Sequence, residues 1–207
     1  MAATFVYDGS FEGLLCVLHL LRERGEEPDR IRAEGGALQE SLLGETVFVR
    51  TEAPRAEEMC REIDERVSPA ALRRAFRAFL SEEEGVEDHI HGYLGLGWEL
   101  GADVDARLGD EHVFAVHSLS RRTGREAHRM RGFLRFRRLQ GGLYYAPMRP
   151  ECDVLCLVAP HFVRRMAGEE LFIHDLDRHS VFIYRRGKAQ LLHMPPFRPQ
   201  QAEEDRK

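Results

Sequence analysis

Residues 121–145 combine the two side-chain types that a nucleic-acid surface needs. The stretch contains eight arginines against a single acid, Glu126, and four aromatic residues. A guanidinium is a planar, permanently charged group that matches phosphate oxygens, and an aromatic ring offers a face on which a base can stack. The residues that we expect to contact nucleic acid are Arg121, Arg125, Arg129, Arg131, Arg135, Arg137, Phe133, Phe136 and Tyr144. The stretch therefore indicates a polyanionic partner.

The net charge of −5 conceals an uneven distribution along the chain. Residues 1–110 carry 24 acids and 12 arginines, a balance of −12, whereas residues 111–207 carry 11 acids and 18 basic residues, a balance of +7. The second half is thus suited to a polyanion, and the first half resists non-specific adhesion to one. Two structural alternatives remain for the arginines: a solvated helix face paired with the acidic half, and charge protection of an edge strand.

A second candidate site lies where the first expected strand gives way to a helix, at residues 8–13. Backbone N–H groups at a helix start attract phosphate, so Ser10 is a candidate anion contact. Asp8 and Glu12 could hold a metal or act as a base. A tight turn in which Ser10 caps the helix explains the same residues without any ligand.

Histidines in the second half offer a further candidate. His161 precedes Arg164 and Arg165, and we expect these three residues to form an anion site beside a helix start, with ordinary packing as the alternative. An enzymatic interpretation would combine Asp8 and Glu12, as metal ligands or base, with His128 or His161 as acid or base.

The cysteines do not indicate a disulfide framework or a metal centre. Cys152 and Cys156 form a CxxxC pair with no second pair, which favours buried thiols at helical spacing over zinc. We therefore predict no resident metal or cofactor. No apolar run approaches the roughly 18 residues that a membrane span needs. We expect a cytoplasmic protein with no membrane partner.

Hydrophobic periodicity predicts an α+β fold with an acidic, mainly helical first half and a basic second half. The first half opens with a short β-α-β segment, and the second half holds antiparallel hairpins around a helix. The expected strands are 4–7, 46–50, 133–137, 143–148, 171–175, 181–185 and 189–193. The expected helices are 11–24, 51–66, 71–80, a short one from Ser81 toward Tyr93, 110–130 and 155–166. We expect a surface connection at 28–43 and a glycine-broken segment at 92–101.

These elements predict one two-lobed domain over residues 1–194, with a lobe boundary near residues 103–110. The last residues, 195–207, are rich in proline, glutamine and charge, and we expect them to be disordered.

Several separated blocks of the chain resemble the signature of an uncharacterised bacterial family whose members are described as probable DNA metabolism proteins and carry a domain of unknown function. The blocks occur in order within Thr4–Tyr184, at residues 7–14, 78–82, 125–130, 132–136, 144–147 and 159–162. The resemblance implies a DNA repair context, because members are typically encoded beside a radical-SAM protein. Some are fused to a uracil-DNA-glycosylase-superfamily domain. It also favours functional roles for residues that lie in the blocks, namely Asp8, Glu12, His128, Arg129, Arg135 and His161.

We therefore expect a DNA-binding accessory protein of a repair or base-modification system. It would bind single-stranded DNA or a distorted duplex, and a radical-SAM or uracil-DNA-glycosylase-type partner would perform the chemistry. One alternative is an enzyme that acts on DNA or a nucleotide through the carboxylate, histidine and arginine residues named above. A second is a protein-interaction module that docks an acidic partner.

Overall fold

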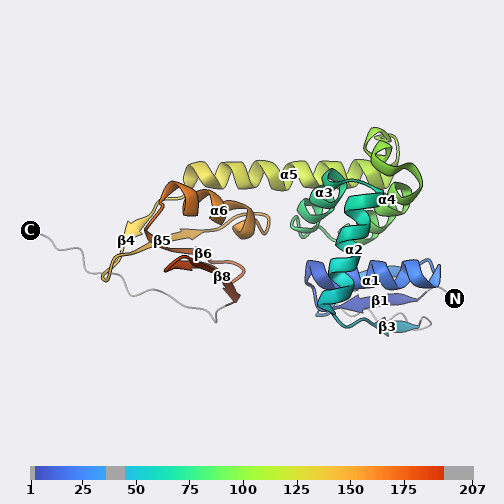
Figure 1. The fold of residues 1–207 in the computed structure, drawn as a ribbon, viewed down its shortest axis with the longest axis horizontal. Helices are drawn as coiled ribbons and strands as arrows, with labels where there is room; N and C mark the ends of the chain where they lie inside the picture. Colours follow the sequence, from blue (N-terminus) through green and yellow to red (C-terminus); the bar gives the residue numbers. More distant parts are fainter. Residues whose placement is uncertain (1–2, 36–44, 194–207) are drawn as a thin grey trace, which may run out of the picture. The chain divides into compact units, whose positions relative to one another are not determined.

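The computed structural model of the chain describes residues 3–35 and 45–193. It divides into two compact units, the first ending at Arg121 and the second beginning at Arg122, and each has its own apolar core (Figure 1). Six α-helices and two sheets within the described residues confirm the predicted α+β fold. The expected disordered tail at 195–207 and residues 36–43 of the expected 28–43 connection lie outside the described residues. No helix in residues 3–35 and 45–193 has both the length and the apolar character that a membrane crossing requires.

The first unit is built on a three-stranded parallel sheet in the order β2-β1-β3. The central strand β1 (Thr4–Tyr7) pairs with β2 (Arg30–Ala33) and with β3 (Thr46–Phe48). The helix α1 (Phe11–Arg24) connects β1 to β2; Ser10 caps its start, and Gly25, in the left-handed conformation, ends it. The interpretation of 30–33 as a surface connection is wrong. Ile31 is the one buried residue of β2, so the strand carries little apolar signal.

Helices complete the first unit: α2 (Ala53–Arg66), α3 (Pro69–Phe79), α4 (Val86–Leu100) and the 3-10 helix η1 (Gly101–Ala106). The predicted helix at 71–80 is confirmed as α3, which begins at Pro69 because the hydroxyl of Ser68 accepts the N–H of Ala71. The predicted helix start at Ser81 and the predicted glycine break at 92–101 are both wrong. Helix α4 begins after Gly85 and continues through Gly92 and Gly97 to Leu100.

Close packing explains why α4 tolerates its glycines. A Cβ atom on Gly97 would lie 2.8 Å from Val67 Cγ1, and one on Gly92 would lie 2.5 Å from the ring of His112. These contacts exist only because no side chain intervenes, so tertiary packing outweighs the low helix propensity of glycine.

The helix α5 (Glu111–Phe133) begins in the first unit and ends in the second. Asp110 Oδ1 accepts the N–H groups of His112 and Val113 and so caps the start. Val113 and Val116 pack in the first core and Ala127 in the second. The predicted helix at 110–130 is confirmed, and it extends one turn further.

The second unit contains a five-stranded sheet in the order β4-β5-β6-β7-β8. Its strands are β4 (Arg137–Arg138), β5 (Leu143–Met148), β6 (Glu170–Asp175), β7 (Ser180–Arg185) and β8 (Lys188–His193). The expected hairpins β4-β5 and β7-β8 are confirmed. The sheet also contains a parallel pair, β5 and β6, because the helix α6 (Leu155–Arg165) crosses over between them (Figure 1).

The predicted strand at 133–137 is wrong for most of its length. Helix α5 continues to Phe133, and only Arg137 and Arg138 pair with β5. The side chain of Arg135 explains where the helix stops: its Nη1 donates to the carbonyl oxygens of Gly132 at 2.7 Å and Leu134 at 3.0 Å. Basic side chains commonly satisfy free carbonyl groups at a helix end in this way.

Candidate nucleic-acid interface

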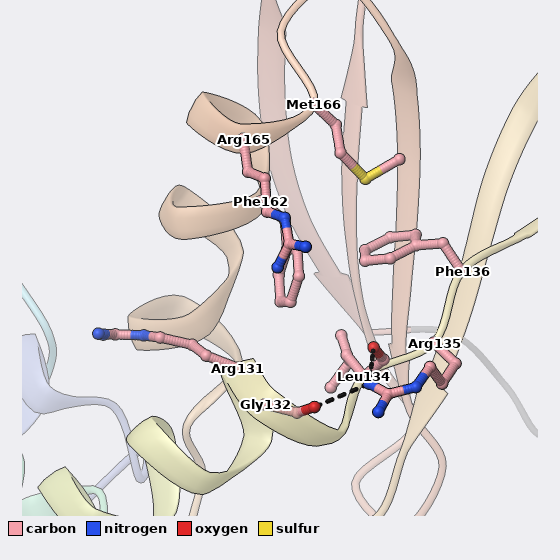
Figure 2. A pocket seen from close by; sticks show the side chains of 8 residues that line it. All are labelled: Arg131, Gly132, Leu134, Arg135, Phe136, Phe162, Arg165 and Met166. Atoms are coloured by element: carbon pink, nitrogen blue, oxygen red, sulfur yellow. Dashed lines mark hydrogen bonds between the residues drawn. The ribbon is translucent and has the colours of Figure 1, made fainter.

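A hollow in the second unit lies between the end of α5 and the end of α6. Its cavity volume is about 590 Å³, within the range of small-ligand sites, which is roughly 300–1,000 Å³. The side chains that line it are drawn in Figure 2, and they are Arg131, Gly132, Leu134, Arg135, Phe136, Phe162, Arg165 and Met166. Three of these residues are arginines and none is acidic.

The floor of the hollow is apolar. Phe162, on α6, is 3% exposed, and its ring centroid lies 4.9 Å from that of Phe136 at an interplanar angle of 59°. Leu134 is buried beside them, and Met166 follows α6. Figure 2 shows Phe136, Phe162 and Met166 turned toward one another. Such a tilted aromatic pair contributes about 0.5–1.5 kcal/mol beyond the area that it buries.

The arginines of the hollow differ in how much of each guanidinium is free. Arg131 donates to the carbonyl oxygen of Leu157 at 3.0 Å, and Figure 2 shows its guanidinium turned away from the rings. Arg135 uses Nη1 to cap α5, which leaves Nε and Nη2 without a partner among the described residues. Arg165 lies three residues after Phe162 on α6, lines the same hollow, and forms no ion pair within the described part of the chain.

His161 lies in the positive electrostatic potential of the arginines near the end of α6. Its pKa is lowered, first by partial desolvation and then by the positive charges of Arg131, Arg165 and Arg164. The prediction that His161 stands at a helix start is wrong, because α6 begins at Leu155 and His161 lies in its second half. Arg164 and Arg165 occupy the last turn, where cations also complement the helix dipole.

Arg129 occupies a different environment from the arginines of the hollow. Its guanidinium is paired with Glu126, which is 4% exposed, and it also contacts Glu151 at 3.3 Å. The hydrogen bond and the charge of Glu126 raise the pKa of Arg129. Glu126 accepts the backbone N–H of Glu151 as well, at 3.2 Å. These contacts tie the segment before α6 to α5.

The other residues predicted to bind nucleic acid are spread over the two units. Arg121 and Arg125 are exposed on α5, and Phe133 is 66% exposed at its end. Arg137 stacks over the ring of Tyr145 at 4.9 Å, and Tyr144 packs in part against the second core. Of the predicted set, the structure brings Arg131, Arg135 and Phe136 together in the hollow.

Residues at the start of α1 are occupied by local hydrogen bonds. Asp8 Oδ1 accepts from the backbone and the hydroxyl of Ser10, at 3.0 and 2.6 Å, and Asp8 Oδ2 accepts from the hydroxyl of Thr51 at 2.7 Å. Ser10 also accepts the N–H of Gly13 as the helix cap. Partial desolvation raises the pKa of Asp8, but these hydrogen bonds outweigh it and the net shift is downward. An ionised Asp8 therefore already supplies negative charge at this helix start.

The residues of the enzymatic interpretation belong to different units. Asp8 and the exposed Glu12 are in the first unit, whereas the exposed His128 and the half-buried His161 are in the second. Neither unit assembles a carboxylate from the first pair with a histidine from the second.

A polar cluster in the first unit centres on Asp105. Its carboxylate accepts from Tyr93 at 2.7 Å and Arg74 at 2.8 Å, and it lies 3.0 Å from Nε2 of His117. Asp105 belongs to η1, Tyr93 to α4, Arg74 to α3 and His117 to α5. Burial and the neighbouring Asp105 raise the pKa of the Tyr93 hydroxyl. The cluster therefore joins four elements of the first unit.

Cys152 and Cys156 have the environment of packed core residues and not that of reactive thiols. Cys152 is fully buried, and burial raises the pKa of the half-buried Cys156 thiol to about 11, so it stays protonated at neutral pH. Within residues 3–35 and 45–193, no three His, Cys, Asp or Glu side chains are grouped so that they could hold a metal ion.

Sequence reasoning named Phe136 but missed the other residues of the apolar floor, Leu134, Phe162 and Met166. Leu134 and Phe162 lie in the blocks 132–136 and 159–162 of the family resemblance, which was the available signal for them. Met166 carries no local pattern that distinguishes it from an ordinary core residue.

Comparison with known proteins supplies a family. Residues 84–207 match the family model described as a domain of unknown function, DUF4130. The match covers more than half of the 207 residues and includes α4, α5 and the whole second unit, and therefore the hollow. It does not extend to residues 4–83, for which the resemblance stays a prediction. No curated protein matches the chain.

Proposed function

The chain belongs to this family of unknown function, and we propose that its second unit binds single-stranded or locally distorted DNA as an accessory to a DNA repair or base-modification enzyme. One observation carries the proposal: three arginines line a hollow that has an aromatic floor and no acidic lining residue, and two of them, Arg135 and Arg165, keep guanidinium donors free of other partners in the described residues. Guanidinium groups bind phosphate, and ring faces accept bases, so the hollow joins both requirements of a nucleic-acid strand.

The apolar floor favours an unpaired strand over a regular duplex. The faces of bases are stacked inside a duplex, and they become available to a protein where the strand is single or distorted. An acidic peptide would engage the arginines but would leave the rings of Phe136 and Phe162 unused. This is why a nucleic-acid strand fits the hollow better than the protein-docking alternative.

The enzymatic alternative has less support from the structure. Its carboxylates, Asp8 and Glu12, belong to the unit that does not contain the hollow, and the oxygens of Asp8 are engaged with Ser10 and Thr51. In the accessory role, a radical-SAM or uracil-DNA-glycosylase-type partner would supply the reaction, as the resemblance to DNA metabolism proteins implies.

Competition binding tests this function with the full chain. The change in fluorescence anisotropy of a labelled 20-nucleotide strand would give its Kd, and unlabelled strand, matched duplex and poly-glutamate would compete. We expect the single strand to compete best and the duplex less well. If poly-glutamate competes as well as DNA at equal charge, or if no strand binds, the proposal is wrong.

A further inference from the structure

The geometry points to a more specific role for the hollow: it receives one unstacked nucleobase of the bound strand, with the adjoining phosphate on Arg165 and Arg135. This inference rests on the proposed function, because it names the part of the strand that the site accepts. It assigns the hollow a ligand, a single nucleotide unit within a strand, and it implies that the site accepts any of the bases.

The shape and lining of the hollow fit a planar aromatic group. Phe136 is half-buried, so part of its ring remains open to a ligand, while Phe162 is almost fully buried and holds it in place. Met166 closes the apolar side with a polarizable thioether, which makes favourable contacts with aromatic rings. The aliphatic stem of Arg131 lines the wall while its guanidinium is held at Leu157, so this arginine adds apolar surface to the hollow.

The charged rim fits the phosphate that accompanies a base. Arg165 has no ion-pair partner among the described residues, and Arg135 keeps its Nε and Nη2 donors free after it caps α5. A guanidinium with two free N–H groups binds phosphate oxygens in a fork. Because Phe162 and Arg165 stand three residues apart on α6 and both line the hollow, a base on the floor and its own phosphate can be held by the same site (Figure 2).

The lining side chains also determine selectivity. They are arginine, leucine, phenylalanine and methionine, apart from Gly132, and no amide, hydroxyl or carboxyl side chain is among them. Arginine can also read a base edge, but here the guanidinium of Arg131 is held at Leu157, and those of Arg135 and Arg165 are assigned to the phosphate, so no side chain of the lining is left to distinguish base edges. Stacking, by contrast, tolerates every base. We therefore expect capture of any unstacked base, tighter for purines because their faces are larger.

The test compares two ten-nucleotide strands of equal charge, one of thymidines and one built only from abasic tetrahydrofuran residues. The wild-type chain should bind the thymidine strand about 5- to 150-fold more tightly, which is the contribution of stacking one base. The Phe136→Leu variant keeps apolar volume but removes the ring. It should lose most of this ratio while its affinity for the abasic strand stays unchanged.

Phe114→Leu is the matched control, because Phe114 is an exposed phenylalanine of α5 in the first unit. It should leave the ratio intact. A 2-aminopurine placed in the strand gives a second readout: its fluorescence should be quenched by stacking in the wild type and less so in Phe136→Leu. A wild-type ratio near one, or an equal ratio in Phe136→Leu, overturns the inference while DNA binding itself stands. Absence of binding to either strand overturns the proposed function as well.

Discussion

Removing Arg164 and Arg165 together should flatten the salt dependence of DNA binding. These two side chains stand in the last turn of α6, and neither has an ion-pair partner in the described residues. Each phosphate that a cation neutralises releases condensed counterions, so the slope of log K against log salt reports the number of such contacts. The double variant removes two cations without touching the apolar floor.

The structure sets the size of the expected change. Three guanidinium groups, those of Arg135, Arg164 and Arg165, are available for phosphate at this end of α6. At about −0.7 per phosphate on a single strand, the wild-type slope is about −2.1, and the variant slope is about −0.7. Between 50 and 200 mM salt, affinity should therefore fall about 18-fold for the wild type and about 3-fold for the variant.

Fluorescence anisotropy with a labelled thymidine strand over this salt range measures both slopes. The control is the Arg73→Ala/Arg77→Ala variant, which removes the same charge from two exposed positions of α3 in the first unit. It should keep the wild-type slope. An unchanged slope in Arg164→Ala/Arg165→Ala would refute the assignment of phosphate contacts to α6. Equal flattening in the control would show that net charge alone governs binding.

Three further predictions concern individual titratable groups. Glu126→Gln should lower the free energy of unfolding by about 1–3 kcal/mol in urea denaturation, since the 4%-exposed carboxylate that accepts from Arg129 and from the N–H of Glu151 is lost, while the exposed Glu151→Gln should cost less than about 0.5 kcal/mol; equal effects would contradict this. Burial raises the pKa of Glu87 despite its hydrogen bond from Tyr7, so the folded state binds more protons and stability should fall as pH rises through the window above 4.5. Glu87→Gln should abolish that decline, measured by denaturation at several pH values, and a persistent decline would assign it to another group. The lowered pKa of His161 should rise when inorganic phosphate or a DNA strand binds, because an anion stabilises the imidazolium; NMR titration of its ring signals would show no rise if anions bind elsewhere.

The sequence predicted those elements whose signals are local. Ser10, Ser68 and Asp110 mark helix starts because each side chain caps the backbone a few residues later. The first expected hairpin, β4-β5, turns at Gly141 and Gly142, and both glycines adopt the positive φ that such a turn requires. Local chemistry of this kind needs no knowledge of the rest of the fold.

Some errors arise where distant contacts decide the structure. Helix α4 continues through Gly97 because Val67, thirty residues earlier, packs against that glycine. The error after Phe133 is of another kind: Arg135 caps the end of α5 through a local contact that the alternating residue pattern does not reveal. Part of the candidate site was predicted, since Arg131, Arg135, Arg165 and Phe136 were all named. The sequence did not predict that these residues line one hollow. Phe136 contacts Phe162 only because α6 crosses over between the two parallel strands β5 and β6.

The central claim is that a DNA strand is bound at the hollow, and photo-crosslinking measures this most directly. A single strand with one 5-bromouridine would be irradiated with the full chain, and mass spectrometry would identify the crosslinked peptides. We predict crosslinks to residues 131–136 and 161–166, with loss of the signal in Phe136→Leu. Crosslinks confined to the first unit, or an undiminished yield in that variant, would contradict the account.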